Sequence, residues 1–279
     1  MMNSQQRPHK CFLAGIMTLA LLCAMRADVS QAQAADDSAE LPVFIVAGQS
    51  NAFRLGSIVA PEVQDDKALW YYPNPSCIDA SKLDATLKRL DLGAAFRGSG
   101  FGIAAELTKQ YPDGFGVIRY AVCGSNLRKQ WTPGKPDGYY NTYFLPFVQQ
   151  GLVAMAAGER KPRICGMFWH QGESDSHSEK DAAGWQAHMN TLVSNFHEVY
   201  GEVPVVMGEI RAFEKKPATA QLNKGVHAVA EAHAMAVAIK LGDVTWQTPT
   251  NVHFSKEGAR VAGVRMVQAV QQLAEKAQK

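Results

Sequence analysis

Residues 42–53 read PVFIVAGQSNAF and combine an apolar run with a polar turn. The first seven residues are apolar or small without interruption, which is typical of a strand buried on both faces of a parallel sheet. Gln49, Ser50 and Asn51 follow directly after Gly48. The order predicts a buried strand that ends in a polar turn, where Ser50 is either an exposed nucleophile or the N-cap of a helix.

Four further apolar runs of strand length follow along the chain, at 115–122, 163–170, 203–210 and 235–242. Segments with helical periodicity alternate with these runs, at 101–110, 141–157, 181–200, 219–233 and 256–277. Alternation of this kind predicts a three-layer α/β/α sandwich around a mainly parallel five-stranded sheet, as in flavodoxin-like folds.

The first 34 residues have the pattern of a secretory signal peptide. Basic residues between positions 7 and 10 precede an apolar run over 11–25, and Ala32-Gln33-Ala34 supplies small residues for cleavage. The run is shorter than the roughly 20 residues that a membrane span needs, so a retained anchor is the weaker alternative. We expect export to the periplasm or the medium, cleavage near Ala34, and a single domain over 35–279 without a membrane span.

The charge of the processed chain is balanced. Removing residues 1–34 leaves 25 basic and 25 acidic residues, because three basic residues and one acidic residue are lost from the 28 and 26 of the whole chain. A nucleic-acid or anionic-membrane partner needs a concentrated basic surface, so neither is expected. The balance suits neutral small molecules or glycans, and it leaves the oligomeric state open.

Three cysteines remain after cleavage: Cys77, Cys123 and Cys165. They allow at most one internal disulfide and leave a thiol over. Cys123 and Cys165 stand at the ends of predicted buried strands, where a cysteine usually acts as a small apolar residue. No C-x-x-C pair is present and the histidines do not cluster at ligand spacings, so we expect no metal and no cofactor.

Polar turns follow three of the predicted strands. Gln49-Ser50-Asn51 comes after the first, 123–126 after the second and 171–175 after the third. Ligands collect beyond the carboxyl ends of the strands in such sheets. His253 lies in a loop between the last strand and the last helix, so we expect it at the same edge, as the base that a serine nucleophile needs.

Four motifs together resemble one family. They are GQSN (48–51), AVCGS (121–125) with Trp131 after it, WHQGESD (169–175) and NVHF (251–254). They resemble the carbohydrate acetylesterases of the SGNH-hydrolase superfamily, above all the sialate O-acetylesterase-like domain and carbohydrate esterase family six. The resemblance spans about 41–275 and implies an acetylated carbohydrate substrate. It also implies Ser50 as nucleophile and His253 as base, with the N–H of Ser50, Gly124 and the Gln171 amide in the oxyanion hole.

One position departs from that pattern. Many relatives carry an aspartate three residues before the histidine, where this chain has Thr250. A hydroxyl cannot supply the charge that steadies an imidazolium, so either a dyad operates or another carboxylate serves. Glu173 is the first candidate for that carboxylate, with Asp175 and Asp243 as alternatives. Glu173 could instead have only a structural role, as a carboxylate that the helix dipole favours at a helix N-terminus. Asn51 is expected to brace the nucleophile turn.

Aromatic residues offer possible sugar contacts. Trp131 and Trp70 are the first candidates, and simple packing is the alternative for each; Tyr71, Tyr72 and Trp246 are further ones. The segments 69–77 and 129–140 are predicted as loops that wall a pocket. Two other functions stay open: a non-catalytic glycan-binding protein on an esterase scaffold, which Thr250 would suit, and a lipase or thioesterase of the same superfamily.

Overall fold

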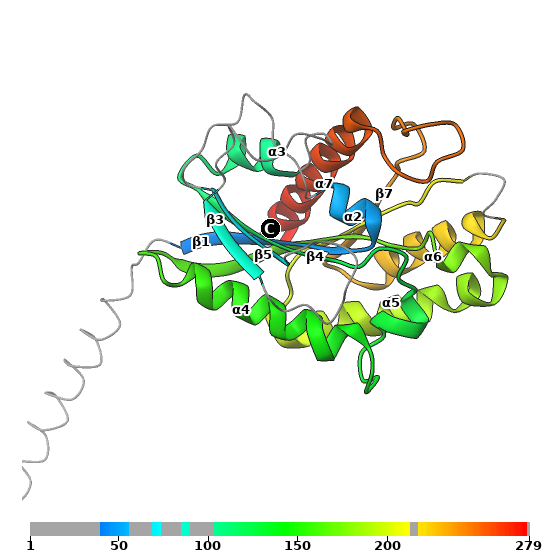
Figure 1. Ribbon diagram of the computed structural model, residues 1–279, viewed down its shortest axis with the longest axis horizontal. Coiled ribbons are helices and arrows are strands. Elements are labelled where there is room, and N and C mark those ends of the chain that lie inside the picture. The colour runs from blue at the N-terminus through cyan, green and yellow to red at the C-terminus, as the bar shows by residue number, and fades with distance from the viewer. Residues whose placement is uncertain (1–39, 56–67, 74–84, 90–102, 213–216, 278–279) are drawn as a thin grey trace, which may run out of the picture. The chain divides into compact units, whose positions relative to one another are not determined.

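The computed structural model describes residues 40–55, 68–73, 85–89, 103–212 and 217–277 (Figure 1). The strands are β1 (Glu40–Gly48), β2 (Ala68–Pro73), β3 (Ala85–Arg89), β4 (Phe115–Ala121), β5 (Lys161–His170), β6 (Val205–Gly208) and β7 (Ala236–Ile239). They form one sheet in the order β3-β2-β4-β1-β5-β6-β7. The predicted signal peptide over 1–34 lies outside the described residues and stays a prediction.

The five predicted strands are found as β1, β4, β5, β6 and β7, paired in parallel. Two strands were missed. β2 overlaps the segment predicted as a loop at 69–77 and pairs in parallel with β4, and β3 runs antiparallel to β2 at the edge. β3 lacks the continuous apolar run of a central strand, because an edge strand tolerates polar residues such as those in ATLKR. β2 lies between β3 and β4 and is apolar and aromatic, ALWYYP, but its aromatic and proline residues resemble those of a loop.

The helices agree with the periodicity of the sequence. They are α3 (Ile103–Gln110), α4 (Leu145–Met155), α5 (Glu179–Tyr200), α6 (Thr219–Ala232) and α7 (Lys256–Ala277), with a short α2 (Ser50–Leu55) after β1. α5 begins two residues before the prediction because the Ser178 side chain caps it, accepting a bond from the Asp181 N–H. No helix in the described part of the chain is long and apolar enough to cross a membrane.

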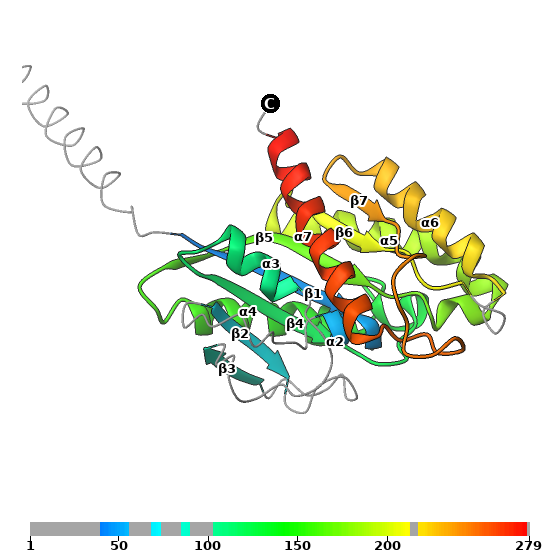
Figure 2. The same cartoon turned by 90° about the horizontal axis from the view of Figure 1, so that it is seen from above.

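Helices cover both faces of the sheet, which confirms the three-layer α/β/α class. α4, α5 and α6 pack on one face, and α2, α3 and α7 on the other (Figures 1 and 2). Successive side chains of β1 point to opposite faces of the sheet and belong to the two cores in turn. Ile45 is buried toward the first group of helices and Phe44 toward the second. This two-sided burial is the physical reason for the unbroken apolar run in β1.

The carboxyl ends of three strands are level with one another. Gly48 at the end of β1 pairs with Ala121 of β4 on one side and with His170 of β5 on the other. The Val122 N–H also donates to the Gly48 carbonyl oxygen at 2.9 Å, which ties the turn after β4 to β1. The three polar turns predicted from the sequence therefore start from one edge of the sheet.

The two described cysteines differ in state. Cys123, in the turn after β4, is disulfide-bonded, and Cys165 in β5 is a free thiol. One cross-link with a thiol left over agrees with the count made from the sequence. The expectation that Cys123 acts as a small apolar residue is wrong, because it is exposed and cross-linked.

Candidate active site

The turn after β1 presses directly against β5. Gly48 has φ +131°, and a Cβ at this position would lie 2.1 Å from the His170 carbonyl oxygen. That close approach lets the Gln49 N–H donate to the same oxygen at 3.0 Å. Ser50 follows as the first residue of α2. Only glycine fits at position 48. Its close contact with β5 fixes the position of Ser50 at the carboxyl end of β1.

We expect Gly48→Ala to lower both the melting temperature and kcat. An added methyl group must push β1 and β5 apart, and overpacking of this kind costs about 1–3 kcal/mol. A displacement of Ser50 by about 1 Å can cost about 10²-fold in rate. Gly242→Ala is the matched control, because its Cβ would meet nothing within 4 Å. Calorimetry and steady-state kinetics would contradict the prediction if Gly48→Ala behaved like Gly242→Ala.

Ser50 and His253 meet at this edge. The Ser50 Oγ lies 3.0 Å from the His253 Nε2, although 203 residues separate them. The N–H of His253 donates to the Asn251 Oδ1 at 2.9 Å, and the next residue, Phe254, is buried. A hydroxyl at this distance from an imidazole nitrogen can transfer its proton without further movement. The side chain of Ser50 therefore faces His253, as a nucleophile requires.

Asn51 joins the nucleophile turn to the histidine loop. Its Nδ2 donates to the Glu173 Oε1 at 2.6 Å and to the Val252 carbonyl oxygen at 2.8 Å, and its Oδ1 accepts from the Phe254 N–H at 3.1 Å. The side chain is fully buried. Asn51 thus holds the backbone on both sides of His253 and places the Glu173 carboxylate beneath the same loop. Asn51 therefore contacts the turn after β5 and the loop of His253 as well as its own turn.

His170 is a neighbour of Glu173 and was not among the predicted site residues. Its Nδ1 lies 3.5 Å from the Glu173 Oε1, and its ring meets Phe254 edge-on with centroids 5.1 Å apart. Among the described residues, neither ring nitrogen has a hydrogen-bond partner. Complete burial lowers the pKa of His170 to about 3, so the ring is neutral at pH 7. Its place at the end of β5, within the WHQGESD motif, was the signal in the sequence.

The burial of His170 predicts acid lability with a defined sign. The unfolded chain binds a proton at this residue below about pH 6.5, whereas the native state does so only near pH 3. Stability from this residue is therefore complete above pH 6.5, and between these pH values it falls by about 1.4 kcal/mol per pH unit of acidification. Urea unfolding of the wild type and His170→Gln over pH 4–7 isolates the slope, since other groups titrate in both. Parallel curves would contradict the prediction.

The turn after β4 carries the expected backbone donor. Gly124 is exposed, with φ +70°, and its N–H has no hydrogen-bond acceptor among the described residues. The next residue fixes the turn: the Ser125 Oγ donates to the Val122 carbonyl oxygen at 2.7 Å and accepts from the Trp131 Nε1 at 2.8 Å. The Gly124 N–H is therefore available to an incoming anion, like the N–H of Ser50 at the start of α2.

Gln171 is placed differently from the expectation. Its Nε2 donates to the Ser125 carbonyl oxygen at 3.0 Å and to the Asp175 Oδ2 at 2.5 Å, and its Oε1 accepts from the Trp185 Nε1 at 3.1 Å. Both amide protons are used and the residue is buried. The expectation of Gln171 as an oxyanion donor does not match this arrangement, because its amide binds the backbone of the turn after β4 at Ser125.

The two alternative carboxylates are engaged elsewhere. Asp175 accepts from the Leu127 N–H and from Gln171, and burial raises its pKa to about 6 although these bonds act in the opposite direction. Asp243 forms a two-pronged pair with Arg265 at 2.7 and 2.6 Å on the surface, and this hydrogen bonding lowers its pKa to about 2. Of the three candidates, Glu173 is the one whose carboxylate shares Asn51 with the histidine loop.

The tryptophan candidates pack in the interior. Trp131 has no exposed surface and meets Trp169 edge-on at 5.1 Å between centroids. Trp70 is 4% exposed and belongs to the core beneath α2, α3 and α7. Neither ring presents a face to a sugar, so packing is the correct reading of both. Tyr71 is also buried, the side chain of Tyr72 lies outside the described part, and Trp246 is half-buried.

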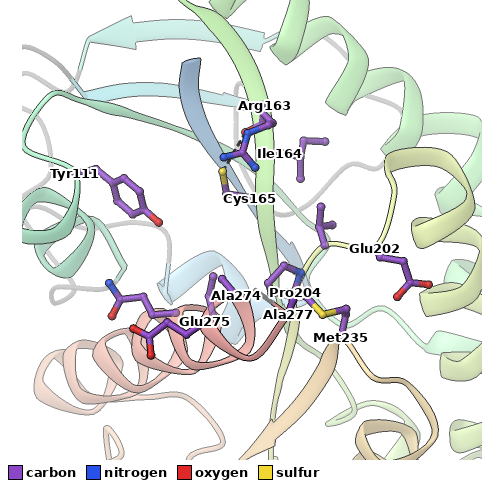
Figure 3. Close-up of a pocket in the computed structure, with 13 residues that line it drawn as sticks. Tyr111, Arg163, Ile164, Cys165, Glu202, Pro204, Met235, Ala274, Glu275 and Ala277 are labelled. Atoms are coloured by element: carbon purple, nitrogen blue, oxygen red, sulfur yellow. Dashed lines mark hydrogen bonds between the residues drawn. The ribbon is translucent and has the colours of Figure 1, made fainter. Parts of the chain in front are cut away.

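A cavity of about 390 Å³ lies at the other edge of the sheet (Figure 3). Its walls come from the beginning of β5, from the segments just before β6 and β7, from the last turns of α7 and from the residue after α3. Among the lining residues are Tyr111, Arg163, Cys165, Met235 and Glu275. These are the amino ends of the parallel strands, whereas Ser50 and His253 stand at the carboxyl ends. The cavity is therefore separate from the candidate active site.

Comparisons with known proteins agree with this fold. A family model described as carbohydrate esterase, sialic acid-specific acetylesterase matches residues 40–272. Among solved structures, a protein from Arabidopsis thaliana has a TM-score of 0.64 and 16% identity over 84% of this chain and 98% of its own. NanS has a TM-score of 0.60 and 16% identity over 85% and 98%. Comparison with curated proteins gives no match.

Proposed function

The chain belongs to the sialic acid-specific acetylesterase family of carbohydrate esterases, and we propose that it removes O-acetyl groups from a carbohydrate through an acetyl-enzyme on Ser50. The observation that carries the proposal is the 3.0 Å contact between the Ser50 Oγ and the His253 Nε2 at the edge of the sheet. That pair has the geometry of a nucleophile and its general base.

The first half of the proposed reaction forms the acetyl-enzyme. The Ser50 oxygen attacks the acetyl carbonyl carbon while His253 takes the hydroxyl proton. The N–H groups of Ser50 and Gly124 donate to the carbonyl oxygen as it becomes an anion, and one such donor is worth about 3 kcal/mol in the transition state. The intermediate then expels the sugar oxygen, which receives the proton from His253, and the acetyl group stays on Ser50.

The second half returns the enzyme to its starting state. Water attacks the acetyl carbon with His253 as base, acetate leaves and Ser50 regains its proton. In both halves the imidazole becomes a cation. In this proposal the negative charge of Glu173 supports that cation, because the Asn51 side chain binds both the Glu173 carboxylate and the backbone on either side of His253. Loss of the charge at such a position can cost about 10⁴-fold in rate.

Acetate release tests the proposal. The wild-type protein is expected to hydrolyse p-nitrophenyl acetate, acetylated xylan or an O-acetylated sialic acid, and to prefer acetyl over butyryl and octanoyl esters. A fluorophosphonate is expected to label Ser50, identified by mass spectrometry of the peptide, and to abolish turnover. A glycan-binding protein without catalysis would neither label nor release acetate. A lipase would show increasing rates with chain length.

Export belongs to the same proposal. The pattern of residues 1–34 supports cleavage near Ala34 and release to the periplasm or the medium. N-terminal sequencing of the protein from the secreting host is expected to begin at or near Ala35. A chain that retains Met1 in the cell interior would contradict this part and leave the chemistry untouched.

A further inference from the structure

The loop that carries His253 is exposed for most of its length. Residues 247–250 are exposed, and the loop is closed at its base by backbone bonds from Gln247 to the His253 carbonyl oxygen (3.0 Å) and from Ser255 to that of Thr245 (3.1 Å). A segment with so little buried apolar surface depends on hydrogen bonds for a fixed conformation. The position of the His253 ring therefore depends on what fills the inside of this loop.

Arg211 supplies three of these bonds from outside the loop, in addition to those that Asn251 makes within it. Its Nη1 donates to the carbonyl oxygens of Thr248 (2.9 Å) and Asn251 (2.5 Å), and its Nη2 donates to that of Pro249 (2.8 Å). Three carbonyls on both sides of Thr250 thus converge on one guanidinium. The planar fork of arginine suits such a set, whereas lysine has a single nitrogen to offer.

The base of Arg211 is itself anchored. Ile210, its neighbour after β6, donates its N–H to the Asn223 Oδ1 at 3.0 Å and accepts from the Asn223 Nδ2 at 3.0 Å. Asn223 lies in the middle of α6, a helix of 14 residues. The guanidinium is therefore carried on a backbone fixed to a rigid element.

The contacts continue from Arg211 to the histidine. Asn251, whose carbonyl oxygen Arg211 binds, accepts the His253 N–H through its Oδ1 at 2.9 Å. The guanidinium also lies 5.1 Å from the centre of the Trp246 ring, which stacks on Phe254 at 4.7 Å between centroids. Arg211 thus contacts the residues just before His253 directly, and Phe254 after it through the Trp246 ring.

We propose that Arg211 is a positioning residue for catalysis, which clamps the loop of residues 247–253 so that the His253 Nε2 stays within reach of the Ser50 Oγ. This role rests on the proposed esterase function. The clamp touches neither substrate nor the reacting atoms. It reduces the range of positions open to the imidazole, and the rate of a proton transfer falls steeply when its partners move apart.

The test compares Arg211→Ala and Arg211→Lys with Arg265→Ala on p-nitrophenyl acetate. Arg265 is the matched control, since its guanidinium also binds a backbone carbonyl, that of Lys240, and the carboxylate of Asp243. We expect kcat to fall about 10- to 100-fold in Arg211→Ala with KM changed less than about threefold, an intermediate loss in Arg211→Lys, and no loss in Arg265→Ala. The rate of fluorophosphonate labelling at Ser50 should fall in parallel.

Rescue distinguishes a clamp from general support of the fold. Millimolar methylguanidinium is expected to restore part of kcat to folded Arg211→Ala and to leave Arg265→Ala unchanged. A folded Arg211→Ala or Arg211→Lys variant with wild-type kcat and labelling rate would overturn the clamp while the esterase function stands. A wild-type protein that neither labels nor turns over would overturn the function, and the clamp with it.

Discussion

Ser50→Ala is expected to lower kcat for acetyl esters by about 10⁴- to 10⁶-fold, the largest effect of any single change in this chain. The methyl group that remains cannot form the acetyl-enzyme, and His253 loses the proton donor that lies 3.0 Å away. The backbone N–H groups that stabilise the oxyanion are unchanged, so a small residual rate over that in water should persist. Initial rates with p-nitrophenyl acetate measure the loss, at enzyme concentrations high enough to detect the residual rate.

His253→Ala and the double variant complete this prediction. Each single change removes the same chemical step, so the double variant should be about as slow as either single one. Melting temperatures should stay close to that of the wild type, since both side chains are partly exposed at the edge of the sheet. Additive losses would show that the two residues act independently. Wild-type rates in Ser50→Ala would exclude this serine as the nucleophile.

The order of the layers was predictable from the sequence because it depends on local patterns. Strands such as β1 are buried on both faces, so their composition alone reveals them. β2 and β3 were not predictable in the same way. β3 is at the edge of the sheet and has fewer apolar contacts to satisfy, whereas β2 is paired on both sides but the aromatic and proline residues around 69–77 look like those of a loop.

The meeting of Ser50 and His253 was also predictable, because parallel strands bring the turns after them to one edge. The fate of individual side chains was not. Gln171 and Trp131 lie in motifs that suggest contact with a ligand, yet their polar atoms are bound to other parts of the interior. Which hydrogen bond such a group makes depends on distances between elements far apart in the sequence, and no local pattern contains them.

Arg211 shows the same limit from the other direction. Nothing in the sequence around 208–212 resembles a motif, and a lone arginine after a strand is usually a solvated side chain. Its role becomes visible only when the carbonyl oxygens of a loop 40 residues further along the chain are placed around its guanidinium. Every residue type has a backbone carbonyl oxygen, so the sequence of the partner loop does not reveal a residue that binds its backbone.

Glu173→Gln is expected to lower kcat by about 10²- to 10⁴-fold, with KM changed less than about threefold. The amide has the shape of the carboxylate, and its oxygen can still accept from the Asn51 Nδ2. What is lost is the negative charge that favours the imidazolium of His253 in both halves of the reaction. The melting temperature should change little, so the kinetic loss will not reflect unfolding.

Two further variants decide whether the role belongs to Glu173. Asp243→Asn should leave kcat within about threefold, because that carboxylate is on the surface with Arg265. Asp175→Asn should cost about tenfold, through disturbance of the Gln171 amide beneath the turn of Gly124. If either aspartate variant were slower than Glu173→Gln, the acid would be an aspartate. If all three kept wild-type rates, Ser50 and His253 would act as a dyad, with the imidazolium held in place by the loop alone.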